Sequence, residues 1–467
     1  MKTLGVVVLA AGKGTRMKTS TPKALVQTLG RPLIDYVLDA VSTFTESENI
    51  SCDIGVVIGH KKELLEEWHA NHSRKNTMKL AWQREQNGTA DALKACFNDL
   101  PEFKNYEYTL VACADTPMLR SEDFSKLFSV LKSNSNCLGV AATFHENNPF
   151  GYGRIVRSEN GFHIVEEKDA TDEQRKITEV NSGVYIVKTS HVMDVIGKIT
   201  NNNKSGEFYL TDLFQDQYSV TPVLFPSGDS FSGVNTLEQL SGVDELLLKQ
   251  KIRELQLKGV TFLRPHSTYM DHEVEISEGV TIYPGVTLLG KTKIASGVVV
   301  ESGCFLKNAM IEENVQVLAH SYLEDALVQK GAAVGPMARI RPGTTIGMKA
   351  KVGNFVEIKK SHLKDGAKVS HLSYVGDAEI GENTNIGCGF ITCNYDGVNK
   401  HKTIIGKNTF IGSDCQVIAP IEIGDSSFVA AGSTITKSVP SGAFAVARGQ
   451  QITKEGTASR FLKTKKS

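Results

Sequence analysis

In the second half of the chain, small aliphatic residues recur at every sixth position. Val274, Val280 and Val286 form a weak instance, and two longer runs comprise Val334, Ile340, Ile346, Val352 and Ile358, then Ile405, Ile411, Val417, Ile423, Val429 and Ile435. This period fits neither a helix, with about 3.6 residues per turn, nor a simple alternating strand. It fits hexapeptide repeats that each place one aliphatic side chain inside a prism. We therefore predict a left-handed parallel β-helix over residues 260–467.

The first half of the chain has a different residue pattern, in which short apolar runs alternate with amphipathic stretches. The apolar runs cover residues 5–10, 55–59, 108–112, 138–143 and 183–187. This alternation predicts an α/β, Rossmann-like domain with a largely parallel sheet over residues 1–236. Residues 237–259 carry a helical pattern and are expected to form a linker.

Charge and hydropathy narrow the range of partners. Lys plus Arg and Asp plus Glu both total 52, so there is no general electrostatic reason to bind nucleic acid or an anionic membrane. No run approaches the roughly 18 to 20 apolar residues that span a bilayer. We expect a cytoplasmic protein that acts on small molecules. The eight cysteines lack metal-binding or disulfide spacing and are expected to be free thiols.

The loop after the first apolar run has the composition of a phosphate site. It reads LAAGKGTRM over residues 9–17, and it is neither a Walker A loop nor a dinucleotide fingerprint. Gly12 and Gly14 allow backbone N–H groups to approach a polyphosphate, while Arg16 and Lys23 can offset charge on a departing pyrophosphate. On these residues alone, a glycine-rich turn with solvated cations is an open alternative.

Further motifs resemble the sugar-1-phosphate nucleotidyltransferase family. QREQNGTADAL from Gln83 resembles that family's loop for the base and sugar, and Asp115 follows the apolar run TLVACA, at the carboxyl end of a predicted strand. GYGR, VEEKDAT and EVNSG contain Gly153, Glu166 and Asn181, which are similar to the family's contacts with an amino sugar. The resemblance implies that N-acetylglucosamine 1-phosphate attacks the α-phosphorus of UTP directly and pyrophosphate leaves.

The same resemblance implies roles for individual residues. Asp115 and Asn235 would hold Mg²⁺, an ion that takes few protein oxygens beside phosphates and water, while Lys23 and Arg16 would act in catalysis. A departure from the family's usual Tyr-Gly pair occurs at Cys113-Ala114, where the added Cβ alters the backbone's approach to the ligand. The implied contacts with UTP or UDP-N-acetylglucosamine are Leu9, Ala10, Gly12, Gly14, Lys23, Gln83, Gln86, Gly88, Thr89, Asp115, Gly153, Glu166, Asn181 and Asn235.

Hexapeptide β-helices include both acyltransferases and inert oligomerisation modules, so the period alone establishes no reaction. Four motifs are more specific: RIRPG at Arg339, NFVEIKK at Asn354, HLSYVGDAEIG at His371 and CNYDG at Cys393, where the repeat is interrupted. Together they resemble the acetyltransferase half of the bacterial family that unites N-acetylglucosamine-1-phosphate uridyltransferase and glucosamine-1-phosphate N-acetyltransferase activities. The resemblance covers about residues 4–456.

By this resemblance, His371 is the general base that takes a proton from the 2-amino group of glucosamine 1-phosphate as that group meets the acetyl-CoA thioester. A lone histidine is otherwise more often structural. The implied contacts with glucosamine 1-phosphate are Arg341, Lys359, Tyr374 and Asn385, and those with acetyl-CoA are Cys388, Asn394, Tyr395, Ser413, Ala431 and Arg448. The family commonly has Ala at the position of Cys388, and it also implies a homotrimer.

The sequence therefore predicts a bifunctional enzyme that acetylates glucosamine 1-phosphate and then transfers a uridylyl group to the product. One alternative is a monofunctional sugar-1-phosphate nucleotidyltransferase with a non-catalytic, oligomerising β-helix. Another is a scaffold or sensor without turnover. His371 and Arg448 argue against the first alternative, and Lys23, Asp115 and His371 argue against the second.

Overall fold

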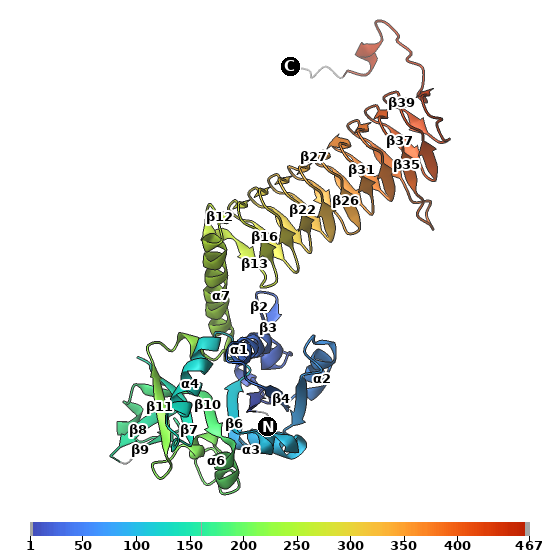
Figure 1. The fold of residues 1–467 in the computed structure, drawn as a ribbon. Helices are drawn as coiled ribbons and strands as arrows, with labels where there is room; N and C mark the ends of the chain where they lie inside the picture. Colours follow the sequence, from blue (N-terminus) through green and yellow to red (C-terminus); the bar gives the residue numbers. More distant parts are fainter. Residues whose placement is uncertain (1–2, 160, 463–467) are drawn as a thin grey trace. The chain divides into compact units, whose positions relative to one another are not determined.

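A computed structural model describes residues 3–159 and 161–462 (Figure 1). The chain divides into two compact units, Met1–Leu247 and Leu248–Ser467. The division falls inside the long helix α7 (Leu237–Leu257), within the range of the predicted linker. Val243 is buried in the first unit, whereas Ile252 and Leu255 are buried in the core of the second.

The first unit contains a mixed sheet with covering helices and a separate antiparallel pair of short strands, β2 and β3. Its strands are β1 (Leu4–Leu9), β2 (Gln27–Thr28), β3 (Arg31–Pro32), β4 (Cys52–Ile58), β5 (Met78–Trp82), β6 (Tyr108–Cys113), β7 (Gly139–His145), β8 (Arg154–Ser158), β9 (Gly161–Val165), β10 (Glu179–Lys188) and β11 (Val220–Phe225). Its other helices are α1 (Leu33–Ser47), α2 (Lys62–Asn71), α3 (Thr89–Asp99), α4 (Ser121–Ser133), α5 (Asp172–Arg175) and α6 (Thr189–Val195). The main sheet has the order β11-β7-β10-β6-β1-β4-β5.

Along this order four of the six strand pairs are parallel, in line with the prediction of a largely parallel sheet, while β8 and β9 add antiparallel pairs beside β10. β1 pairs in parallel with β4 and β6, and β11 with β7, but β10 runs antiparallel to both β6 and β7. The apolar run at residues 183–187 is therefore an antiparallel strand. In β1, Val6 and Val8 pack in one core cluster and Val7 packs in the other, because successive side chains of a strand face opposite sides. The loops after β1 and β6 start at the same edge of the sheet, because these neighbouring strands are parallel.

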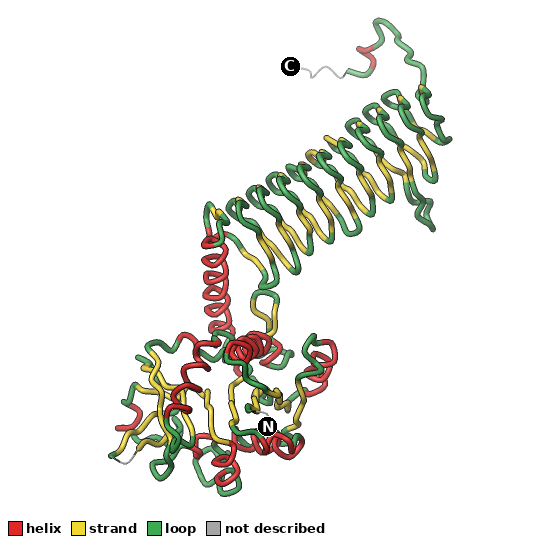
Figure 2. Tube along the Cα trace, in the orientation of Figure 1, coloured by secondary structure: helices red, strands yellow, loops and turns green. Residues whose placement is uncertain are grey.

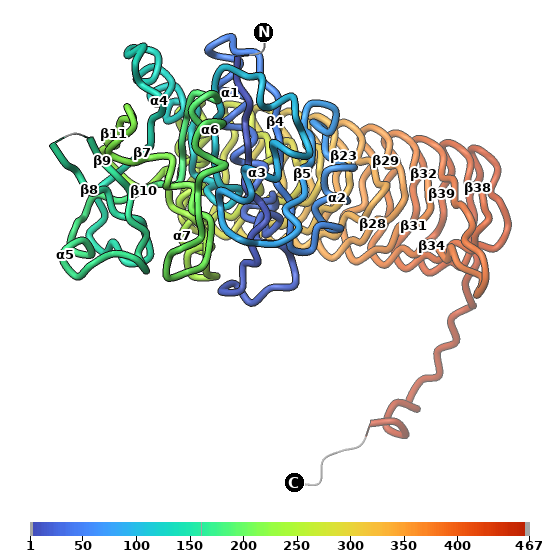
Figure 3. Tube along the Cα trace, turned by 90° about the horizontal axis from the view of Figure 1, so that it is seen from below, coloured from blue at the N-terminus to red at the C-terminus, as the bar shows by residue number. Residues whose placement is uncertain are grey.

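The second unit is a parallel β-helix whose coils each supply one strand to each of three sheets (Figures 2 and 3). The first sheet contains β12 (Thr261–Phe262), β15 (Thr281–Ile282), β18 (Val299–Val300), β21 (Gln316–Val317), β24 (Ala333–Val334), β27 (Lys351–Asn354), β30 (Lys368–His371), β33 (Asn385–Ile386), β36 (Phe410–Ile411), β39 (Phe428–Val429) and β41 (Phe444–Ala445). The second contains β13 (Tyr269–Met270), β16 (Thr287–Leu289), β19 (Phe305–Lys307), β22 (Tyr322–Glu324), β25 (Arg339–Ile340), β28 (Glu357–Lys359), β31 (Tyr374–Gly376), β34 (Ile391–Cys393), β37 (Gln416–Ile418) and β40 (Thr434–Ile435). The third contains β14 (Glu275–Ile276), β17 (Lys293–Ile294), β20 (Met310–Ile311), β23 (Ala326–Val328), β26 (Thr344–Ile346), β29 (His362–Leu363), β32 (Ala378–Ile380), β35 (Thr403–Ile405) and β38 (Ile421–Ile423).

The six-residue period places aliphatic side chains inside the prism. Ile340, Ile346, Val352 and Ile358 are all 0% exposed, and each full burial of such a side chain contributes about 1.5–3 kcal/mol. The predicted fold class is therefore confirmed. The interruption of the repeat lies between β34 and β35, where residues 394–402 leave the coil. Within the residues that the structure describes, no helix is both long and apolar enough to cross a membrane.

Candidate active sites

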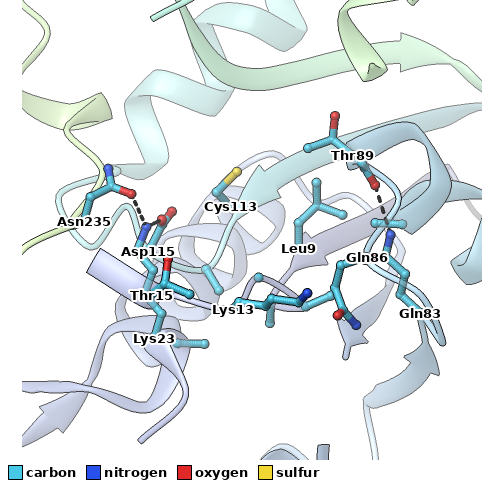
Figure 4. Close-up of a pocket in the computed structure, with 18 of the residues that line it drawn as sticks. Leu9, Lys13, Thr15, Lys23, Gln83, Gln86, Thr89, Cys113, Asp115 and Asn235 are labelled. Atoms are coloured by element: carbon cyan, nitrogen blue, oxygen red, sulfur yellow. Dashed lines mark hydrogen bonds and ion pairs between the residues drawn. The ribbon is translucent and has the colours of Figure 1, made fainter. Parts of the chain in front are cut away.

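The loop after β1 borders a cavity of about 480 Å³ in the first unit (Figure 4). Most of the predicted nucleotide-site residues line this cavity: Leu9, Ala10, Gly12, Gly14, Arg16, Lys23, Gln83, Gln86, Gly88, Thr89, Asp115 and Asn235. They come from the ends of β1, β5 and β6, from the start of α3 and from the segment before α7. Gly88 has a φ of +115°, and a Cβ there would collide with the backbone of Phe208, so this turn requires glycine.

Lys23 links the two residues predicted to hold a metal. Its Nζ donates to the Asp115 carboxylate and, at 2.7 Å, to Oδ1 of Asn235 (Figure 4). Nη2 of Arg16 donates to the same Oδ1 at 2.8 Å. The backbone N–H of Val234 donates to the carbonyl oxygen of Asp115 at 2.9 Å and ties the two segments together. One carboxylate and one amide oxygen therefore converge on a single cation.

This donor set fits a magnesium ion better than a zinc ion. Among residues 3–159 and 161–462, no group of three or more His, Cys, Asp or Glu side chains is arranged to hold a metal. Asp115 and Asn235 supply two oxygens, and Mg²⁺ commonly completes its shell with water and substrate phosphates. Zinc sites instead use three or four protein ligands, mostly Cys and His.

Cys113 lines the cavity but does not have the properties of a nucleophile. Burial raises the pKa of its thiol to about 12, and the neighbouring Asp115 carboxylate adds to the shift. A thiolate, not a thiol, is the reactive form of cysteine. The adjacent Ala114 is 2% exposed and belongs to the core as well as to the cavity wall.

Gly153, Glu166 and Asn181 do not line the described cavity. Asn181 lies in β10, where its N–H donates to the carbonyl oxygen of Gly153 at 2.9 Å and its Nδ2 donates to the hydroxyl of Tyr185 at 2.6 Å. Burial raises the pKa of Glu166, which accepts a hydrogen bond from Thr211 at 3.1 Å. The structure thus brings Gly153 and Asn181 together and leaves Glu166 half-buried.

In the second unit, His371 lies exposed at the end of β30. It is paired in register with Asn354 at the end of β27, and its Nδ1 lies 2.9 Å from Oδ1 of Asn354. Because a carbonyl oxygen only accepts, this contact requires a proton on Nδ1, and in the neutral imidazole Nε2 then keeps a lone pair. This arrangement leaves Nε2 able to take a proton from a substrate.

The predicted acetyl-CoA residues continue along the same edge of the prism. β30, β33, β36, β39 and β41 stack in parallel, so residues that follow these strands in successive coils lie beside one another. Accordingly, the N–H of Asp414 donates to the carbonyl oxygen of Cys388 at 2.6 Å, and that of Gly432 donates to Ser413 at 2.8 Å. Arg448 donates to the carbonyl oxygen of Ala431 at 2.9 Å. His371, Cys388, Ser413, Ala431 and Arg448 therefore form one column.

Three cations gather near the end of β28. Contact with the Lys400 ammonium lowers the pKa of Lys359, and Arg341 adds to the shift. Arg341 is also paired with Glu357 at 2.8 Å. Like charges this close favour an anion between them, and a sugar phosphate has the matching charge.

The remaining predicted residues occupy the same part of the β-helix. Tyr374 is in register with Glu357, and Asn385 with Lys368. In the interruption after β34, Nδ2 of Asn394 donates to Asp377 at 2.5 Å, whereas the Tyr395 hydroxyl donates to the carbonyl oxygen of Gly397 at 2.6 Å.

The two halves match two described domain types. Residues 6–192 match the MobA-like NTP transferase domain, and residues 402–437 match the bacterial transferase hexapeptide, a model of six repeats. The fold and these matches define a nucleotidyltransferase domain followed by a hexapeptide-repeat transferase domain.

Relatives that match nearly the whole chain show the family to which it belongs. Bifunctional protein GlmU of Pelobacter propionicus is 39% identical over 99% of this chain and 100% of its own length, and that of Staphylococcus haemolyticus is 40% identical over 96% of this chain and 98% of its own. The chain therefore belongs to the family of bifunctional GlmU proteins, which confirms the resemblance seen in the motifs. A crystal structure of UDP-glucose pyrophosphorylase complexed with UDP-glucose aligns with 54% of this chain and with 100% of its own chain. The sequence identity is 18% and the TM-score is 0.42.

Sequence reasoning gave no role to two side chains that the structure places at the second site. Asn354 stood in a quoted motif, but only the register of β27 against β30 brings it to His371. Lys400 lies in the interruption and contacts Lys359. The six-residue repeat does not predict this contact, because the interruption does not follow the repeat. The basic residues of the interruption, with Lys402 nearby, are the sequence feature that could have indicated an anion site there.

Proposed function

We propose that this chain makes UDP-N-acetylglucosamine in two steps at two separate sites. In the first step, the β-helix transfers an acetyl group from acetyl-CoA to glucosamine 1-phosphate. In the second, the α/β unit transfers a uridylyl group from UTP to the acetylated product. The observation that carries this proposal is the presence of both the Lys23–Asp115–Asn235 cluster and the His371–Asn354 pair in one chain that matches GlmU proteins over nearly its full length.

Uridylyl transfer needs charge stabilisation rather than a protein nucleophile. A phosphate oxygen of N-acetylglucosamine 1-phosphate bonds to the α-phosphorus of UTP as the bond to pyrophosphate breaks. The loop of Gly12 and Gly14 would offer backbone N–H groups to the phosphates, while Arg16 and Lys23 offset the charge that develops on the leaving pyrophosphate. The neutral Cys113 thiol agrees with a direct displacement.

Asp115 and Asn235 would hold Mg²⁺, since their oxygens already converge on the Lys23 ammonium. When bound, the ion would neutralise phosphate charge. Lys23, whose ammonium lies beside both oxygens, would add a second positive charge for the phosphates.

Acetyl transfer needs a base and a place for the departing thiol. Nε2 of His371 would take a proton from the 2-amino nitrogen while that nitrogen bonds to the thioester carbonyl carbon. The C–S bond then breaks, and the CoA sulfur leaves and is protonated. Arg341, Lys359 and Lys400 would hold the sugar phosphate, and Tyr374 and Asn385 would border the sugar. The column from Cys388 to Arg448, with Asn394 and Tyr395, would bind acetyl-CoA.

The proposed assembly is a homotrimer. Phe410, Phe428 and Phe444 project from the first sheet of the β-helix as a stacked ladder, and they are 41%, 45% and 67% exposed. Exposed aromatic rings in a contiguous row are typical of surfaces covered by another molecule. A neighbouring copy would cover such a row and complete the acetyl-CoA site. Sedimentation that finds a fully active monomer would contradict this assembly.

Two separate assays test the function. Pyrophosphate release is measured with UTP, N-acetylglucosamine 1-phosphate and Mg²⁺, and thiol release is measured with acetyl-CoA and glucosamine 1-phosphate. The proposal expects both activities from one purified chain. Pyrophosphate release without thiol release would favour the monofunctional nucleotidyltransferase, and the absence of both would contradict the proposal.

A further inference from the structure

The amide of Gln83 is held in one orientation at the wall of the nucleotide cavity. This side chain is 4% exposed, and its Nε2 donates to the carbonyl oxygen of Gly88 at 3.0 Å and to Oδ2 of Asp91 at 2.8 Å. A carbonyl and a carboxylate oxygen only accept hydrogen bonds, so a flipped amide would set acceptor against acceptor. Oε1 is therefore the atom that remains to meet a ligand.

The partners of Gln83 are themselves held in place. Asp91 lies in the first turn of α3. The turn before α3 is clamped by the N–H of Phe208, which donates to Asn87 at 2.7 Å, and by the N–H of Ala90, which donates to Phe208 at 2.9 Å. At the other end of the helix, Asp99 accepts from the N–H of Trp82 at 2.8 Å. Because the start of α3 is tied to Phe208 and its end to β5, Asp91 cannot follow Gln83 into another orientation.

The second glutamine of this loop is not held in this way. Gln86 lines the same cavity and is only half-buried, and among the described residues no hydrogen bond fixes its side chain. Its amide can present either oxygen or nitrogen to a ligand. Discrimination between bases that differ in a single donor or acceptor therefore falls to Gln83.

We propose that Asp91 is a positioning residue that sets the base specificity of uridylyl transfer. By fixing Oε1 of Gln83 as an acceptor, it favours a pyrimidine with an N–H donor at N3, as in uracil. Cytosine carries a lone pair at N3 and would face the acceptor Oε1 with a second acceptor. Asp91 itself does not touch the nucleotide. This inference rests on the proposed uridylyl transfer and goes beyond it by naming how the base is selected.

The test compares UTP with CTP as substrates of the full chain. In Asp91→Ala the amide of Gln83 keeps only its hydrogen bond to the Gly88 carbonyl oxygen and is held less firmly, so the preference for UTP over CTP in kcat/KM should fall about tenfold. The KM for UTP should rise by a similar factor, while kcat changes little. Asp91→Asn keeps an oxygen that can accept from Nε2 and should retain most of the preference. The double variant Asp91→Ala/Gln83→Ala should discriminate no worse than Gln83→Ala alone, because Asp91 acts through Gln83.

A matched control separates positioning from helix stabilisation. Glu63 is also an acidic residue in the first turn of a helix, α2, but it is exposed. Both carboxylates interact favourably with a helix N-terminus, so Glu63→Ala controls for that effect and should keep the parent preference. An unchanged UTP preference in Asp91→Ala, or additive losses in the double variant, would overturn the inference. If the parent chain releases no pyrophosphate from UTP, the proposed function itself fails.

Discussion

The two sites differ in how far a single unit encloses them. In the α/β unit, Lys23 and Asp115 side chains are 14% and 23% exposed and border a cavity of about 480 Å³. In the β-helix, Arg341 and Glu357 are 36% and 34% exposed, and His371 stands on an exposed edge. Fixed charges act most strongly where water is excluded. The α/β unit therefore already shields Lys23 and Asp115 from much of the solvent, whereas the β-helix by itself leaves His371 exposed.

The largest expected effect comes from Asp115→Ala at the enclosed site. Pyrophosphate release should fall by at least about a thousandfold, because the proposed metal loses its only carboxylate ligand, an interaction worth several kcal/mol. Thiol release measured in the same preparation should be unchanged, because Asp115 belongs to the other unit. Loss of both activities in folded protein would contradict two independent sites.

The reciprocal variant is His371→Ala at the exposed site. Removing a general base should slow acetyl transfer by about a hundredfold to a thousandfold. Pyrophosphate release from preformed N-acetylglucosamine 1-phosphate provides the internal control and should match the parent rate. Acetyl transfer at the parent rate would show that another group takes the proton.

Asn354→Ala tests the exposed site more finely than His371→Ala, because Asn354 orients the general base but does not itself take the proton. Loss of the 2.9 Å hydrogen bond should lower kcat for acetyl transfer about tenfold. Asn354→Asp keeps an acceptor for Nδ1 and should recover much of that loss. The split between kcat and KM is the informative readout, since Asn354 contacts the base and a loss confined to kcat reports on the proton transfer. A parent kcat in Asn354→Ala would contradict this role.

Lys400→Ala tests whether the interruption contributes to the second site. The KM for glucosamine 1-phosphate should rise by about fivefold to tenfold with little change in kcat, as for one lost charged contact with a phosphate. Lys437→Ala removes an exposed cation elsewhere on the β-helix and is the matched control. Equal effects of the two variants would assign the change to general electrostatics.

The smallest effect is expected for Cys113→Ala. Since burial raises the pKa of this thiol to about 12, it stays protonated at neutral pH and takes no covalent part in the reaction. The rate of pyrophosphate release should change by less than about threefold. Rapid alkylation of Cys113 at pH 7, detected by peptide mass spectrometry, would contradict a protonated, buried thiol.

Much of the fold follows from local patterns in the sequence. Ile340 and Ile346 are six apart and both fully buried, because each hexapeptide supplies one interior position. Asp115 was expected at the end of a strand and follows β6, since an apolar run of that length predicts a buried strand. The run at residues 183–187 did not reveal its antiparallel direction, because strand direction depends on long-range pairing.

The residues that complete the sites were harder to predict. Asn354 meets His371 only because one coil of the prism separates them, and Lys400 meets Lys359 only through the interruption. Asp91 contacts Gln83 because α3 folds back onto β5. Such contacts depend on register and loop geometry, which residue spacing alone does not fix.

A complementation assay tests the existence of two independent sites most directly. Asp115→Ala and His371→Ala are each supplied with glucosamine 1-phosphate, acetyl-CoA, UTP and Mg²⁺, alone and as an equimolar mixture. Each variant alone should make UDP-N-acetylglucosamine at least about a hundredfold more slowly than the parent, whereas the mixture should make it readily after a lag, because the acetylated intermediate diffuses from one protein to the other. A mixture as inactive as its parts would contradict two separable reactions on this chain.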